Sequence, residues 1–110
     1  MRAVVALANP ATDEMMDFHL TMLGRPTAVI FSDVEEANEL AAAVTAAWGV
    51  TGYVGAVLQL HADTTDGAIA ELTRIWPDYG KNVFLDAGHP AVVEAMKFLR
   101  AGGQLEGPAV

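Results

Sequence analysis

Seven polar side chains follow the predicted strands or open the helices after them, and together they could form an acid–base or metal site. Carboxylates and imidazoles that lie close together can transfer protons, and they are also common ligands of divalent metals. In a parallel sheet the carboxyl ends of the strands meet at one edge, where ligands bind. The sequence therefore predicts a candidate pocket at this edge. Its members are Asn9, Asp33, Gln59, His61, Asp63, Asp86 and His89.

Four of these side chains also have a structural interpretation, and the sequence leaves both interpretations open. Asn9 and Asp33 stand where helix caps stand, and Asp63 belongs to a turn sequence. His89 precedes Pro90, a residue that favours the first position of a helix. At these positions the residue type is explained without a ligand or a substrate.

His61 and Asp86 have no such capping role. An alternative function therefore follows from them: a small enzyme or metal binder that uses His61, Asp86 and His89. The structural interpretation is a surface histidine that forms a hydrogen bond with a neighbouring carboxylate. The chain has no glycine loop for phosphate, no His-Glu-x-x-His and no Gly-x-Ser-x-Gly. We therefore expect no catalytic residue, no cofactor and no bound metal.

Alternating strands and helices are predicted to position these residues. Helical spacing of apolar residues and capping signals predict a helix after each of four apolar runs. This alternation is typical of right-handed β-α-β units. We expect one flavodoxin-like, three-layer α/β domain over residues 1–110, with a parallel sheet in the order 2-1-3-4. Residues 104–110 are expected to be a tail or a rudimentary fifth strand, and the final helix is missing. The predicted strands are 3–8, 27–32, 53–60 and 83–85, and the predicted helices are 10–23, 34–48, 69–79 and 90–99.

The composition narrows the range of partners. The formal net charge of −8 repels nucleic acid and anionic lipid, so neither is expected. No apolar run approaches the ~20 residues that span a membrane, and the N-terminal run is too short for a signal peptide. The absence of cysteine fits a reducing compartment, so we expect a cytoplasmic protein. With 53% hydrophobic residues, the chain also favours a protein partner.

The fourth predicted helix is the expected interface. It carries more apolar side chains than one helix face can bury within a subunit. Without a final helix, the fourth strand would also leave an open edge, which invites pairing. We expect association through this strand, this helix and the tail, either with another protein or with a second copy in a homodimer. The expected interface residues are Val93, Met96, Phe98 and Leu99.

Several segments between residues 53 and 103 follow the order of features in a response-regulator receiver domain. The segment 56–59 resembles the third strand of a receiver, and Asp66-Gly67 with 69–75 resembles its third helix. The segments 83–87 and 91–96 resemble the fourth strand and helix. Residues 1–52 are similar to a receiver only in layout. The resemblance implies a receiver-like fold and a role in signalling.

The residues that carry receiver chemistry are replaced in this chain. A receiver holds magnesium with adjacent acids after its first strand, where residues 7–9 here are Leu-Ala-Asn. Gln59 or, with a shift of two, His61 stands at the position of the phosphorylated aspartate, and Asp86 replaces the switch hydroxyl. The resemblance therefore implies a degenerate pseudo-receiver: a phosphorylation-independent, non-catalytic module for signalling or protein interaction.

Overall fold

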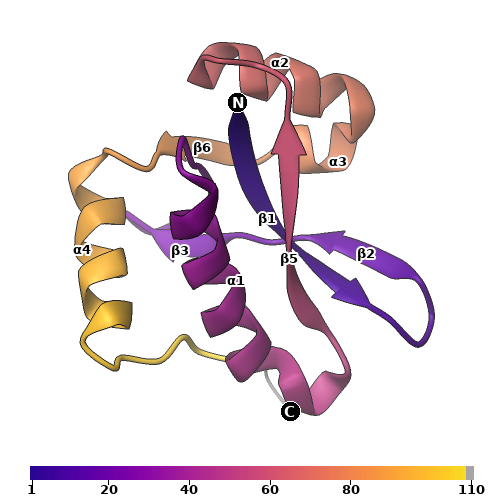
Figure 1. Ribbon diagram of the computed structural model, residues 1–110, viewed down its shortest axis with the longest axis vertical. Helices are drawn as coiled ribbons and strands as arrows, with labels where there is room; N and C mark the ends of the chain where they lie inside the picture. Colours follow the sequence, from indigo (N-terminus) through magenta and orange to yellow (C-terminus); the bar gives the residue numbers. More distant parts are fainter. Residues whose placement is uncertain (109–110) are drawn as a thin grey trace.

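The chain has an α/β fold, and the computed structural model describes residues 1–108. Strands and helices alternate from β4 onward, whereas the first strands follow one another directly (Figure 1). The elements in chain order are β1 (Arg2–Asn9), β2 (Glu14–Asp17), β3 (Leu20–Met22), β4 (Arg25–Ile30), α1 (Val34–Trp48), η1 (Gly49–Thr51), β5 (Val54–Leu60), α2 (Thr65–Ile75), α3 (Pro77–Gly80), β6 (Val83–Asp86) and α4 (Pro90–Arg100).

The strands form two three-stranded sheets, with neighbours in the order β2-β1-β5 and β3-β4-β6. β1 is antiparallel to β2 and β5, whereas β4 is antiparallel to β3 and parallel to β6. An antiparallel bridge between Ala3 and Phe31 connects the two sheets. The predicted flavodoxin-like parallel sheet in the order 2-1-3-4 is therefore wrong. β1 runs against its neighbours, and β6 lies beside β4 rather than beside β5.

The error originates in residues 10–23, where the sequence predicts a helix and the chain forms two hairpins. Residues 10–13 reverse the chain between β1 and β2, with Asp13 at a φ of 59°. Leu23 and Gly24 connect β3 to β4, and both have positive φ, as the tightest hairpin turns require. A hairpin reverses the strand direction, whereas parallel neighbours need a crossover. β1 is antiparallel to β5, and the Ala3–Phe31 bridge sets it against the end of β4 and therefore against β6 as well.

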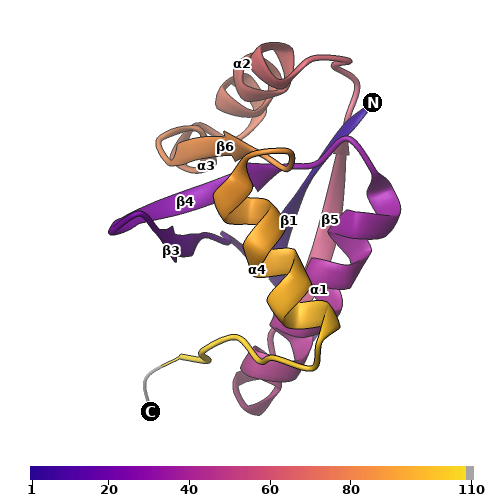
Figure 2. The same ribbon diagram turned by 90° about the vertical axis from the view of Figure 1, so that its left-hand side faces the viewer.

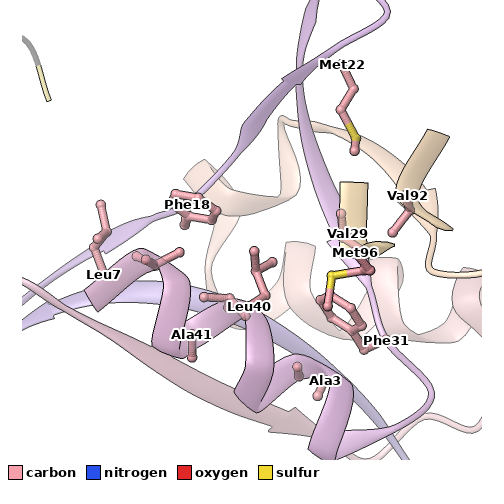
Figure 3. Packing of buried hydrophobic residues seen from close by; sticks show 13 residues of the cluster. Ala3, Leu7, Phe18, Met22, Val29, Phe31, Leu40, Ala41, Val92 and Met96 are labelled. Carbon is pink, nitrogen blue, oxygen red and sulfur yellow. The ribbon is translucent and has the colours of Figure 1, made fainter. Parts of the chain in front are cut away.

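Helices cover both faces of the strands, and alternate residues of β1 belong to two separate clusters. Val5 belongs to the cluster that contains side chains of α1 and α4. Ala6 belongs to the cluster that contains side chains of α2 and α3. Figure 3 shows the first cluster, in which Phe31, Leu40 and Met96 come from β4's end, α1 and α4. β1 and β4 are thus buried on both faces, although the sheets are not parallel.

Tyr79 holds the segment that crosses from one sheet to the other. Its side chain is buried, and its hydroxyl lies 2.7 Å from the Val5 carbonyl oxygen and 3.3 Å from that of Phe18. Burial raises the pKa of this phenol, so it remains a protonated donor. Nearby, the Asn82 amide donates to Asp17 at 2.8 Å. These contacts hold the end of β2 and Phe18, which follows it, against the core.

The chain leaves α4 as an irregular tail. Residues 101–108 form no strand, and residues 109–110 lie outside the described part of the chain. Figures 1 and 2 show the tail leaving the end of α4 and passing the C-terminal end of α1. No helix within residues 1–108 is long and apolar enough to cross a membrane.

Candidate functional site

Six of the seven candidate residues lie at one end of the molecule, and Asn9 lies at the other. The carboxyl ends of β4, β5 and β6 share an end because all three strands run against β1. Asn9 is the last residue of β1, and its side chain accepts from Ala11 N at 3.0 Å in a turn. Its predicted role as a helix cap is therefore wrong. We call the remaining six residues the polar edge. They are Asp33, Gln59, His61, Asp63, Asp86 and His89.

His61 pairs with a carboxylate that the sequence analysis did not select. Its Nδ1 lies 3.3 Å from a Glu71 oxygen, while the imidazole side chain is 100% exposed. Glu71 also accepts from the backbone N–H groups of His61 and Ala62 at 3.0 Å. The His61 backbone N–H is the largest cause that lowers the pKa of Glu71. Glu71 lies ten residues away on α2, and no local pattern in the sequence predicts this contact.

The side chains of Asp86 and Asp63 accept hydrogen bonds from different parts of the chain. Asp86 accepts from the Thr65 hydroxyl at 2.6 Å and from Gly88 N at 2.8 Å. These bonds, the Thr65 bond first, lower the pKa of its carboxyl group. Asp63 accepts from the N-terminal ammonium of Met1 at 2.7 Å, which lowers the pKa of Asp63. Both carboxylates are therefore stabilised in the charged form.

Three helices begin at the polar edge, and each has a side-chain cap. Asp33 accepts from the second residue of α1 at 2.9 Å, and Thr64 accepts from Gly67 N at 3.0 Å at the start of α2. His89 Nδ1 accepts from Ala91 N at 3.1 Å at the start of α4. The capping interpretation of Asp33 and His89 is confirmed. Acceptance at Nδ1 leaves the ring proton of neutral His89 on Nε2.

The side chains of the polar edge form separate hydrogen bonds rather than one network. Within residues 1–108, no hydrogen bond joins the side chains of any two of His61, Asp86 and His89, although the His89 backbone N–H donates to the Asp86 carbonyl at 2.9 Å. In the same part of the chain, no group of three or more histidine and acidic side chains is placed to hold a metal. Gln59 is exposed near the end of β5. Arg2 lies near enough to contribute to the lowered pKa values of both Asp63 and Asp86.

A groove of about 380 Å³ lies at the other end of α1. Its lining comes from Trp48, from residues 18–21, which lead from the end of β2 into β3, and from the tail. Leu105, in the tail, is partly buried and packs against the core cluster. We call this feature the tail groove. It is lined by Phe18, His19, Leu20, Thr21, Trp48, Gln104, Leu105, Glu106 and Gly107.

The four expected interface residues differ in exposure. Phe98 is 56% exposed, Val93 is also exposed, and Leu99 is partly buried. Met96 is 3% exposed and belongs to the core, so it cannot contribute to an open surface. The Phe98 ring packs on the backbone at Gly103, where the tail begins. The exposed aromatic side chain thus stands at the base of the tail.

No protein-family model matches the chain, and no match was found among curated proteins or solved structures.

Proposed function

We propose that this protein is a non-catalytic, phosphorylation-independent module that binds another protein through the surface around Phe98. The observation that carries the proposal is the 56% exposure of Phe98. Aromatic residues are enriched at protein interfaces, because they bury a large apolar area when a partner covers them. A partner that covers Phe98 would also meet the tail and the adjoining hollow between α1 and α4.

The hollow beside Phe98 supports the proposal. It measures about 410 Å³ and lies between α1 and α4. Arg100, at its rim, donates to Glu39 at 2.8 Å and to Glu36 at 3.2 Å. An apolar floor with charged groups at its rim matches the usual anatomy of an interface. The lining residues are Glu39, Ala42, Ala43, Leu99, Arg100 and Gly103.

The alternative function, a small enzyme or metal binder, has less support from the geometry. Acid–base catalysis needs its groups within reach of one reacting atom. His61, Asp86 and His89 instead make separate bonds with Glu71, Thr65 and the start of α4. The proposal therefore gives these side chains structural roles.

Signalling in the cytoplasm is part of the same proposal. The support for a reducing compartment is a chain of 110 residues without cysteine. The support for independence from phosphorylation is chemical: Gln59 is not a nucleophile, and Leu7 and Ala8 offer no carboxylate for magnesium. Because the sheet is not flavodoxin-like, the proposal does not extend to a receiver fold.

The test compares two variants that each add one glutamate. Phe98→Glu places a charge on the proposed surface, and Ala70→Glu places the same charge on an exposed position of α2. We expect wild type and Ala70→Glu to retain the same partner, either a second copy in sedimentation velocity or a protein captured from the native host. We expect Phe98→Glu to lose it. Equal retention by Phe98→Glu would contradict the proposal.

A further inference from the structure

The free edge of β5 has none of the side chains that commonly protect such an edge. β5 is the last strand in the order β2-β1-β5, so one side of its backbone has no neighbouring strand. Its seven residues include no charged side chain and no proline. An edge of this kind invites pairing with a strand of another molecule. Any protection of this edge must therefore come from other parts of the chain.

Alternate residues of β5 direct their backbone groups away from β1. In an antiparallel pair, only every second residue exchanges hydrogen bonds with the partner strand. Gln59 lies opposite Ala3, and the N–H and C=O groups of Ala3 both bond with Phe31 instead. Gln59, Val57 and Gly55 therefore present their N–H and C=O groups at the free edge.

Thr45, on α1, caps the free edge at Gly55. The Gly55 N–H donates to the Thr45 hydroxyl oxygen at 2.8 Å, as its outward direction requires. The Thr45 hydroxyl itself donates to the Ala41 carbonyl at 2.9 Å, which leaves its oxygen free to accept. α1 can lie this close to β5 (Figure 2) because a Cβ at position 55 would overlap the Ala41 carbonyl. The Thr45 hydroxyl therefore occupies the place that a pairing strand would need.

Glu71, on α2, caps the other end of the free edge. Its carboxylate accepts from the N–H groups of His61 and Ala62, which directly follow β5, at 3.0 Å. A strand that reached this end would meet an occupied N–H group and a negative charge. Within residues 1–108, the outward N–H groups of Val57 and Gln59 form no hydrogen bond. The two caps thus leave open only a short window in the middle of β5.

We propose that Thr45 and Glu71 form an autoinhibitory contact that closes the free edge of β5 against strand pairing. A strand confined to the window between the caps could form few hydrogen bonds, whereas an uncapped edge offers the usual length of a strand. In pure protein, the partner of an uncapped edge is the same edge of a second copy, paired about a two-fold axis. The contact does not involve the surface around Phe98, so this inference is independent of the proposed function.

A double variant without caps tests the proposal against a matched control. Thr45→Ala/Glu71→Ala removes both acceptors. Thr73→Ala/Glu94→Ala removes the same residue types from α2 and α4, where Thr73 also donates to a helical carbonyl, at 2.7 Å, and Glu94 pairs with a lysine of its own helix. In sedimentation velocity over a micromolar series, the uncapped variant should associate with a constant at least about ten-fold above that of wild type. The control should match wild type.

Amide hydrogen exchange, measured by NMR, locates the pairing. In wild type, the amides of Val57 and Gln59 should exchange on the order of 100-fold faster than those of Ala56 and Leu58, whose N–H groups face β1. In the associated uncapped variant, the amides of Val57 and Gln59 should become as protected as those of Ala56 and Leu58.

Addition of Gln59→Lys to the uncapped variant separates strand pairing from loss of stability. A lysine on an edge strand opposes pairing, but it restores neither of the removed hydrogen bonds. The triple variant should therefore sediment like wild type. Association that persists in the triple variant would come from partial unfolding and would contradict the proposal.

Two further outcomes would overturn the autoinhibitory contact. One is an uncapped variant that sediments like the control. The other is an uncapped variant that associates while the amides of Val57 and Gln59 remain unprotected. Neither outcome bears on the proposed function, which Phe98→Glu tests separately.

Discussion

The polar edge and the tail groove lie at opposite ends of α1. They differ in whether their side chains already have hydrogen-bond partners within the subunit. At the polar edge, the side chains of Asp33, Asp86 and His89 each accept a hydrogen bond from within the subunit. At the other end, Phe98 is exposed and Leu105 is held without hydrogen bonds. Residue types that suggest chemistry can thus serve the fold, while the surface available to a partner carries apolar side chains.

The largest expected effect on stability comes from a substitution at the apolar end, beside the tail groove. Trp48 is half-buried and packs against the core cluster beside Leu105. Trp48→Ala should lower the free energy of unfolding by about 2–3 kcal/mol, below the range for a fully buried tryptophan, because part of the ring already contacts water. Urea denaturation would measure this loss. A loss below about 1 kcal/mol would mean that the ring makes little contact with the core.

A smaller effect is expected from the hydroxyl that serves Asp86. Thr65→Val should cost about 0.5–1 kcal/mol at pH 7, a value reduced by solvent screening at this exposed site. The bond lowers the folded-state pKa of Asp86, so its contribution is fully present above the unfolded value of about 3.9. It is lost as the pH falls through the lowered folded-state pKa.

The difference in unfolding free energy between wild type and Thr65→Val should therefore shrink in acid. Urea titrations at several pH values down to the lowest at which both proteins fold would measure it. Thr21→Val, on the exposed side of β3, is the control for the loss of a hydroxyl elsewhere. A difference that persists unchanged in acid would show that Thr65 acts through something other than the charge of Asp86.

The pair formed by His61 and Glu71 sharpens the comparison within the polar edge. His61→Ala should leave the urea midpoint unchanged, because the imidazole is fully exposed. Glu71→Gln should lower the midpoint, because the Glu71 carboxylate accepts two backbone N–H groups. A larger fall for His61→Ala than for Glu71→Gln would reverse the roles assigned to this pair.

No effect at all is expected from phosphoryl donors. Incubation with acetyl phosphate or beryllofluoride and magnesium should add no mass, because neither Gln59 nor His61 is an aspartate nucleophile with acids beside it. Intact-mass spectrometry checks this directly. A stoichiometric gain in mass would contradict phosphorylation independence. It would make the residues of the polar edge candidates for the phosphorylated position.

Most elements after residue 24 could be predicted from the sequence, because their signals are local. Asp33 marks the start of α1, Pro90 that of α4, and apolar runs mark β4, β5 and β6. The helix predicted over residues 10–23 was wrong because the apolar residues there match a helical period by coincidence. Phe18 and Met22 are buried, whereas Met15 is 50% exposed on β2. A period does not reveal which of its members face the core.

The direction of the strands could not be predicted from the sequence, since it depends on two turns with weak signals. Leu23 adopts a φ of 53°. An asparagine at this position would have indicated a tight turn, because asparagine tolerates positive φ, whereas a leucine does not indicate one. The wrong direction predicted for β1 also affects the candidate site. Its residues at the ends of β4, β5 and β6 do share one end, and Asn9 does not, because β1 is reversed.

The pairing of β1 with β5 also sets the order in which the protein can assemble. β1 ends at residue 9, but its partner β5 begins only at residue 54. β4 ends at residue 30, and its partner β6 begins at residue 83. Contacts between segments so distant along the chain form slowly, because a long loop must close first. Of the strand pairings, only those of the two hairpins can form early in synthesis. A nascent chain that ends near residue 50 therefore presents the unpaired edges of β1 and β4, and aggregation would compete with folding at that stage.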